Sequence, residues 1–266
     1  MTDVCMQKRG QKRDAHATAW LLSIMRNWIA VFAVLLLWMG AAAARAQGVD
    51  HSPFEQILKA HLHDGMVDYR AIAEKDGAAL DAYLGTLART DPAALERDER
   101  LALYLNLYNA TMIDAVLDRY REGFSVSENE FAIFKLPLVR VGGRTMTLDH
   151  LENKIIRPEF TEPRSHAALV CAARSCPPLR AEAYTGEKLE KQLDDQMRKW
   201  LGNSQLNQIS EGDGPLRVSE IFKWYAEDFG GTEKIATYID AYHPVETTGR
   251  AVEFVPYDWA LNDRKR

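Results

Sequence analysis

Apolar residues recur at helical spacing along most of this chain from residue 54 onward. Positions i, i+3, i+4 and i+7 on one face are typical of amphipathic helices. Thr185, Ser219 and Thr232 are suitable start signals, and Gly230-Gly231 is a suitable stop. The predicted helices cover residues 54–62, 78–88, 99–120, 148–156, 187–201, 220–229 and 233–242.

Only a few stretches have the character of strands. Residues 139–147 predict a hairpin around a Gly142-Gly143 turn. Residues 167–171, 216–218 and 252–255 are short strand candidates, and the strand order cannot be read. Many helices with few short strands predict an α+β fold, a single compact and mostly helical domain with a small sheet and a hairpin.

The start of the chain has the pattern of a secretory signal peptide. A basic start at Met25-Arg26 precedes an apolar run at residues 28–39, and Ala44-Arg45-Ala46 is a small-x-small ending. We therefore expect cleavage before Gln47. Because residues 1–24 make the leader over-long, Met25 is an alternative start.

This pattern predicts a signal peptide at residues 1–46, a single domain at residues 47–266, and a periplasmic or secreted protein. The apolar run is too short to span a bilayer comfortably, and no second run follows. We expect no stable membrane insertion after cleavage, with an uncleaved anchor as the alternative.

Charge disfavours two classes of partner. The formal net charge of the whole chain is −5, and residues 1–46 hold six basic and two acidic residues, so the remainder carries about −9. An acidic surface without a Lys/Arg run argues against nucleic acid and anionic lipid as partners.

Several polar residues fall on apolar helix faces. On helical wheels Asn106 and Asn109 lie in the apolar sector of residues 101–117, and Glu152 and Asp228 lie in those of their own helices. Because burying an unpaired amide or carboxylate costs several kcal/mol, these groups need partners. One interpretation is that they pair with each other, with backbone or with an arginine such as Arg157, and fix the packing. The other is that they line one internal cleft.

The chain has three cysteines, and only Cys171 and Cys176 follow the leader. An even pair in an oxidising compartment is the usual setting for a disulfide. The intervening residues are long enough to turn the chain, and Pro177 favours an extended Cys176. A structural disulfide is the first interpretation.

Nucleophilic catalysis is the second interpretation of the same segment. Cys176 would be the nucleophile, His166 the base, and Glu152 or Asn109 the group that orients the imidazole ring. On a strand, the separation of five between His166 and Cys171 would place their side chains on opposite faces, so Cys176 is the better nucleophile.

Metal binding is the third interpretation, and the spacing of these residues matches no zinc pattern. A serine hydrolase lacks its Gly-x-Ser-x-Gly turn, and no glycine-rich phosphate loop is present in the sequence. We predict no metal and no cofactor.

Motifs spread over residues 53–262 resemble those of one known family, the domain of unknown function 547. They are Val67-Asp68-Tyr69, Tyr104-Leu-Asn106-Leu-Tyr108-Asn109-Ala110, Leu148-Asp-His-Leu-Glu152-Asn-Lys-Ile-Ile-Arg157, Arg164-Ser-His166-Ala-Ala-Leu-Val-Cys171, Cys176-Pro-Pro-Leu179, Phe222-Lys-Trp224-Tyr225-Ala-Glu-Asp228-Phe229 and Tyr257-Asp258-Trp259-Ala-Leu-Asn262.

The resemblance implies an exported bacterial protein without a known reaction. Its motifs contain the same inward polar residues that the helical wheels indicate. The chain departs from the family pattern at Asn153, where a histidine commonly follows the glutamate. If that histidine is a base elsewhere, this chain has to rely on His166.

Taken together, the sequence predicts a cleft lined by Cys176, Cys171, His166, Glu152, Arg157, Asn106 and Asn109. If the protein is an enzyme, a thiol-dependent hydrolase or acyl or peptidyl transferase is expected. The alternative is a non-catalytic binding or scaffold domain with a Cys171–Cys176 disulfide. The partner would be an unknown small molecule or peptide, and neither the substrate nor the oligomeric state follows from the sequence.

Overall fold

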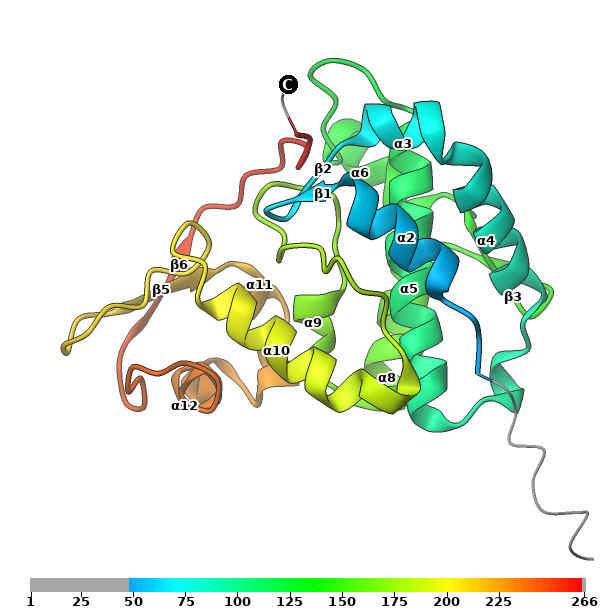
Figure 1. The fold of residues 1–266 in the computed structure, drawn as a ribbon. Coiled ribbons are helices and arrows are strands. Elements are labelled where there is room, and N and C mark those ends of the chain that lie inside the picture. Colours follow the sequence, from blue (N-terminus) through cyan, green and yellow to red (C-terminus); the bar gives the residue numbers. More distant parts are fainter. Residues whose placement is uncertain (1–47, 265–266) are drawn as a thin grey trace, which may run out of the picture. The chain divides into compact units, whose positions relative to one another are not determined.

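The computed structural model describes residues 48–264, in which one long helix, α5 (Arg97–Leu117), packs among several other elements (Figure 1). Almost every side chain of α5 from Leu101 to Val116 is buried. A helix that is covered on all sides lies inside the fold and not on its surface. The predicted signal peptide and its cleavage point lie outside the described residues.

The N-terminal helices pack together with α5. They are α2 (Ser52–His61), α3 (Tyr69–Lys75) and α4 (Gly77–Arg89), followed by the short η1 (Pro92–Ala94). Pro53 stands in the first turn of α2, where its missing N–H leaves no helical bond unmade. The carboxylate of Asp68 caps α3 by accepting a hydrogen bond from the N–H of Ala71 at 3.0 Å.

The C-terminal half packs around a second amphipathic helix, α10 (Leu189–Leu201), which contacts both α5 and α9 (Ser165–Ala168). Leu189, Leu193, Met197 and Trp200 of α10 are buried on one face. The elements around it are η3 (Gly186–Lys188), β5 (Leu216–Ser219), α11 (Ile221–Trp224), η4 (Ala226–Phe229), η5 (Thr232–Lys234), α12 (Ile235–Asp240) and β6 (Val252–Val255).

Each sheet in the described residues has two strands. The pairs β1–β2 (Leu62–His63 and Met66–Val67) and β3–β4 (Val139–Val141 and Arg144–Met146) are antiparallel, and β5–β6 is parallel. Gly142 and Gly143 connect β3 to β4 with φ of 56° and 71°, so the predicted Gly-Gly hairpin is confirmed. The α+β, mostly helical fold class is confirmed as well.

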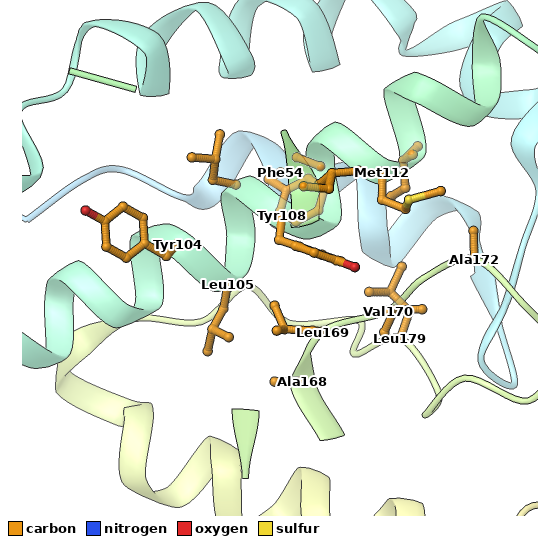
Figure 2. Close-up of a cluster of buried hydrophobic side chains, with 14 of the residues drawn as sticks. Phe54, Tyr104, Leu105, Tyr108, Met112, Ala168, Leu169, Val170, Ala172 and Leu179 are labelled. Atoms are coloured by element: carbon orange, nitrogen blue, oxygen red, sulfur yellow. The ribbon is translucent and has the colours of Figure 1, made fainter. Parts of the chain in front are cut away.

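The buried side chains form two clusters. The larger one surrounds α5 and extends to residues 168–173, where Ala168, Leu169 and Val170 lie against Leu105 and Tyr108 of α5 (Figure 2). The smaller one contains the stacked rings of Trp200 and Phe222. The border between the two clusters is where the candidate site lies.

The segment predicted as one helix over residues 148–156 has a wider turn in its middle. It begins as α7 (Leu148–His150), continues as the π-helical η2 (Leu151–Ile156) and ends as α8 (Arg157–Phe160). Pro158 has no N–H to donate to the preceding turn, which removes one ordinary helical bond there. The N–H of Arg157 bonds instead to the carbonyl of Glu152, five residues back. Turns of this kind are frequent at functional sites.

Two other expectations differ from the structure. Residues 167–171 are not a strand, because Ser165–Ala168 form the one-turn helix α9 and the next residues bond to a side chain of α5. The helix predicted over residues 220–229 breaks at Tyr225 into α11 and η4, and the left-handed Gly230 ends it as expected. The helix α6 (Glu128–Lys135), which was not predicted, carries left-handed residues at 129–131.

No helix within residues 48–264 combines the length and the apolar character that crossing a bilayer requires.

Candidate functional site

A cleft of about 510 Å³ opens where the two buried clusters meet. Its size falls in the usual range for small-molecule sites. Aromatic residues are the largest group in its wall, and a smaller number of polar side chains face it. The aromatic residues are Tyr108, Phe131, Phe134, Trp224, Tyr225, Tyr257 and Trp259, and the polar ones are Lys135, Asp149, Glu152, Asn153 and His166, with Cys171 and Cys176 beside them.

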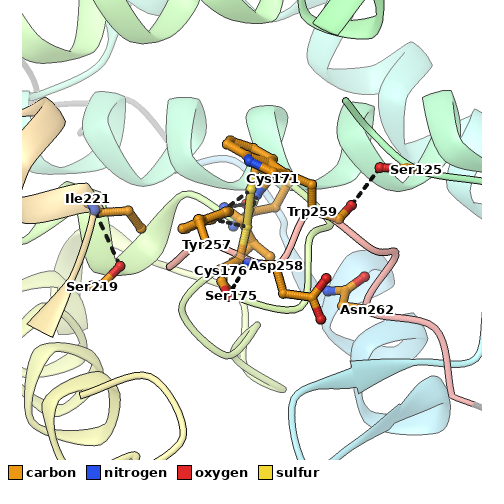
Figure 3. The surroundings of a disulfide bond; sticks show 12 residues. Ser125, Cys171, Ser175, Cys176, Ser219, Ile221, Tyr257, Asp258, Trp259 and Asn262 are labelled. Carbon is orange, nitrogen blue, oxygen red and sulfur yellow. Dashed lines mark hydrogen bonds between the residues drawn. A yellow bond between two sulfur atoms is a disulfide. The ribbon is translucent and has the colours of Figure 1, made fainter. Parts of the chain in front are cut away.

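Cys171 and Cys176 are joined in a disulfide bond at one wall of this cleft (Figure 3). Their Cα atoms are 6.2 Å apart, within the range that a disulfide spans. The hydroxyl of Tyr257 lies 3.2 Å from the sulfur of Cys171 and donates to that of Cys176 at 3.3 Å. In this state neither cysteine has a free thiol.

The loop between the two cysteines is fastened to the C-terminal segment of the chain. The N–H of Arg174 donates to the carbonyl of Ala260 at 2.8 Å, and the N–H of Asn262 donates to the carbonyl of Ala172 at 2.9 Å. The hydroxyl of Ser175 accepts from the N–H of Asp258 (Figure 3). These bonds hold Tyr257 and Trp259 beside the disulfide.

His166 is held by a carboxylate from η4. Its Nε2 lies 2.7 Å from Oδ2 of Asp228, and only 2% of its side chain is exposed. Arg157 donates to both carboxylate oxygens of Asp228, at 2.6 and 3.1 Å. Hydrogen bonds from His166 and then Arg157 hold the pKa of Asp228 well below its usual range. Because this carboxylate is ionised, Nε2 carries the proton and donates it.

Tyr225 is in contact with both hydrogen-bond partners of Asp228, His166 and Arg157. Its ring stacks on His166 with centroids 4.1 Å apart, and the guanidinium of Arg157 lies 4.8 Å from its centroid. The break between α11 and η4 at this residue lets Tyr225 pack here while Trp224 faces the cleft. Tyr225, His166, Arg157 and Asp228 therefore form one packed unit.

Glu152 is half-buried and faces the cleft from the π-helical turn. Burial, and then the negative charge of Glu152, raise the pKa of Tyr108, Tyr225 and Tyr257. Three phenols from distant parts of the chain thus surround this carboxylate and stay protonated.

The two buried asparagines of α5 have a different position from the one expected. The amide of Asn109 donates to the carbonyl of Ala168 and accepts from the N–H of Val170, both at 2.9 Å. Asn106 makes the same pair of bonds with the backbone of Tyr184, at 2.7 and 3.0 Å. Their burial was predicted, but neither lines the cleft; they fix the segments that form it.

The structure therefore brings together four of the seven predicted site residues at the cleft: Cys171, Cys176, His166 and Glu152. Arg157 lies one layer behind, against Tyr225 and Asp228. The group that orients the imidazole is Asp228, and not Glu152 or Asn109 as the sequence suggested.

The aromatic wall was not predicted as part of the site. Its signal is visible in the sequence, where Trp224-Tyr225 and the Tyr257/Trp259 pair stand close together. In a sequence, aromatic residues are most simply interpreted as part of the core. Only the structure, in which these rings come together at the cleft, shows that they line a site. Among the described residues, no group of three or more His, Cys, Asp and Glu side chains is placed to hold a metal ion.

Comparison with known proteins gives one match. A model of the family described as "Protein of unknown function, DUF547" matches residues 92–201. This stretch contains Tyr108, Glu152, His166 and both disulfide cysteines, while the wall formed by Trp224, Tyr257 and Trp259 lies beyond it. No curated protein and no solved structure matches the chain significantly.

Proposed function

We propose, on the premise that this chain belongs to the DUF547 family through residues 92–201, that its cleft binds a small molecule or a peptide side chain without covalent chemistry. The observation that carries the proposal is that both sulfurs at the cleft are used in the Cys171–Cys176 disulfide, while half of the remaining lining residues are aromatic. An apolar site with a few convergent polar groups is the usual form of a ligand pocket.

The proposed place of action is outside the cytoplasm, in the periplasm or the medium. Two features support it: the leader pattern of residues 1–46 and a disulfide, which persists in oxidising compartments. In such a compartment the disulfide closes the loop of residues 171–176 and stabilises it by about 2 kcal/mol on the loop-entropy estimate.

Peptide mapping of the unreduced protein tests the disulfide. Trypsin cuts after Arg174, between the two cysteines, so residues 165–174 and 175–180 form two separate peptides. After treatment with iodoacetamide and without reductant, we expect these peptides to be recovered as one linked species. Separate, alkylated peptides would contradict a structural disulfide.

That contradicting result would favour the second candidate, a thiol-dependent hydrolase or transferase. The observation in its favour is that His166 and both sulfurs line the same cleft. Cys176 would be the nucleophile and His166 the base, held by Asp228. This function requires a free thiol, so the same peptide map decides between the two candidates.

A neutral apolar dye, N-phenyl-1-naphthylamine, tests binding at the cleft directly. Its fluorescence rises when it leaves water, and we expect the protein to bind it. Trp224→Ala should weaken binding about tenfold, because it removes an aromatic contact worth roughly 1.4 kcal/mol. Trp200→Phe, in the buried cluster away from the cleft, is the matched control and should leave dye affinity unchanged. Absence of dye binding would contradict the proposal.

A further inference from the structure

Three rings in contact form one part of the cleft wall. The Trp224–Tyr257, Tyr257–Trp259 and Trp224–Trp259 ring centroids are 4.8, 4.3 and 5.5 Å apart. Trp224 is 43% exposed, and it is the large hydrophobic residue left exposed in the described part of the chain. An exposed indole beside other rings in a concave site is typical of a binding surface.

The charges that face this wall are not balanced. Glu152 and Asp149 are the carboxylates of the cleft, and Lys135 and His166 are its basic side chains. Lys135 donates to the carbonyl of Glu130 at 2.9 Å, and His166 donates to Asp228. Lys135 keeps its charge in its bond to Glu130, and the two carboxylates outnumber this one ammonium group.

Glu152 in particular forms no ion pair with another described residue, and the charge of Arg157 acts on it only from a longer distance. Within residues 48–264, no lysine, arginine or histidine lies within ion-pair distance of it, and Arg157 is engaged bidentately by Asp228. Phenols can donate hydrogen bonds to this carboxylate but do not neutralise it. A half-buried carboxylate without an ion pair attracts a cation more strongly than one in bulk water.

Aromatic faces and a carboxylate in one pocket are the two features that bind organic cations. The face of an indole or phenol ring attracts an ammonium group electrostatically, and the attraction grows when the cation is desolvated. We propose that the ligand of this cleft is a small organic cation, an ammonium group on an apolar body. This inference rests on the proposed binding function and adds the charge of the ligand. The ammonium group lies against Trp224, Tyr257 and Trp259, and Glu152 supplies the counter-charge.

The test compares three probes of nearly the same shape that differ in charge. Choline is the cation, 3,3-dimethyl-1-butanol is its neutral isostere, and 3,3-dimethylbutyrate is an anion of similar size. Each is measured by displacement of N-phenyl-1-naphthylamine from the full chain. We expect choline to bind at least tenfold more tightly than the alcohol, and the anion to bind weakest.

Variants assign the effect of charge to one residue. Glu152→Gln should weaken choline binding about tenfold and leave binding of the alcohol within about twofold, because only the counter-charge is lost. Glu159→Gln, an exposed position on α8 outside the cleft, is the matched control and should change neither. Thermal unfolding of each variant checks that the fold is intact.

The outcomes separate the two proposals. If the dye binds and the alcohol or the anion equals choline, the cation inference is overturned and the binding function stands. Failure of choline to displace a bound dye, or an unchanged choline affinity in a folded Glu152→Gln variant, overturns the inference in the same way. If neither the dye nor any probe binds, both proposals are overturned.

Discussion

Asn109→Ala is expected to lower the free energy of unfolding by about 3 kcal/mol, well above the effect of a typical substitution. Asn109 is 3% exposed, and its amide satisfies both the carbonyl of Ala168 and the N–H of Val170. Alanine leaves these two backbone groups buried without partners, and each such loss costs roughly 1–3 kcal/mol. Urea unfolding at constant slope measures the difference through the midpoint concentration.

Asn153→Ala is the matched control for this substitution. The amide of Asn153 contacts the side chains of Asp149 and Arg157 at the edge of the cleft, where solvent can replace it. We expect a loss below about 1 kcal/mol there, because no buried backbone group is left unpaired. If Asn109→Ala cost no more than Asn153→Ala, the amide would not be what fixes residues 168–170.

The two asparagines of α5 show that helical periodicity predicts which side chains are buried but not which groups they bind. It places Asn106 and Asn109 on the buried face, and both are buried. It cannot give their partners, because the backbone groups of Ala168 and Tyr184 lie 59 and 78 residues further along the chain. The inward direction was therefore predictable and the structural role was not.

The local geometry next to the cleft was predicted least well. A short apolar run such as residues 167–171 is compatible with a strand or a helical turn, and here tertiary bonds from α5 decide. The π-helical turn at Glu152 depends on Pro158 and on packing, so an ideal wheel misjudges the direction of that side chain slightly. Both errors concern residues that the site uses.

Asp228 was predicted to face inward with Arg157 among its possible partners, but its second partner, His166, was not predicted. The helix over residues 220–229 breaks at Tyr225, and the carboxylate then reaches Arg157 and His166. A sequence shows that such a residue needs a partner, because an unpaired buried charge is costly. It does not show which of several arginines and histidines supplies it.

Asp228→Asn is expected to destabilise the fold by about 2 kcal/mol at pH 7 and by about 1 kcal/mol less at pH 3. The hydrogen bonds from His166 and Arg157 depress the pKa of Asp228 in the folded state. A depressed carboxyl pKa contributes stability that is complete above the unfolded value, about 3.9, and is lost as pH falls through the folded value. At pH 3 the unfolded chain already binds most of one proton that the folded chain does not, so about 1 kcal/mol of the contribution is gone.

Urea unfolding of both proteins from pH 7 to pH 3 measures this difference. Asp213→Asn, at an exposed carboxylate, is the matched control and should stay within about 0.5 kcal/mol of the unsubstituted protein at pH 7. A constant difference between Asp228→Asn and the unsubstituted protein over this range would contradict the depressed pKa. Because Asp228 also fixes the ring of His166 against Tyr225, a folded Asp228→Asn variant should leave the disulfide intact while loosening that side of the cleft.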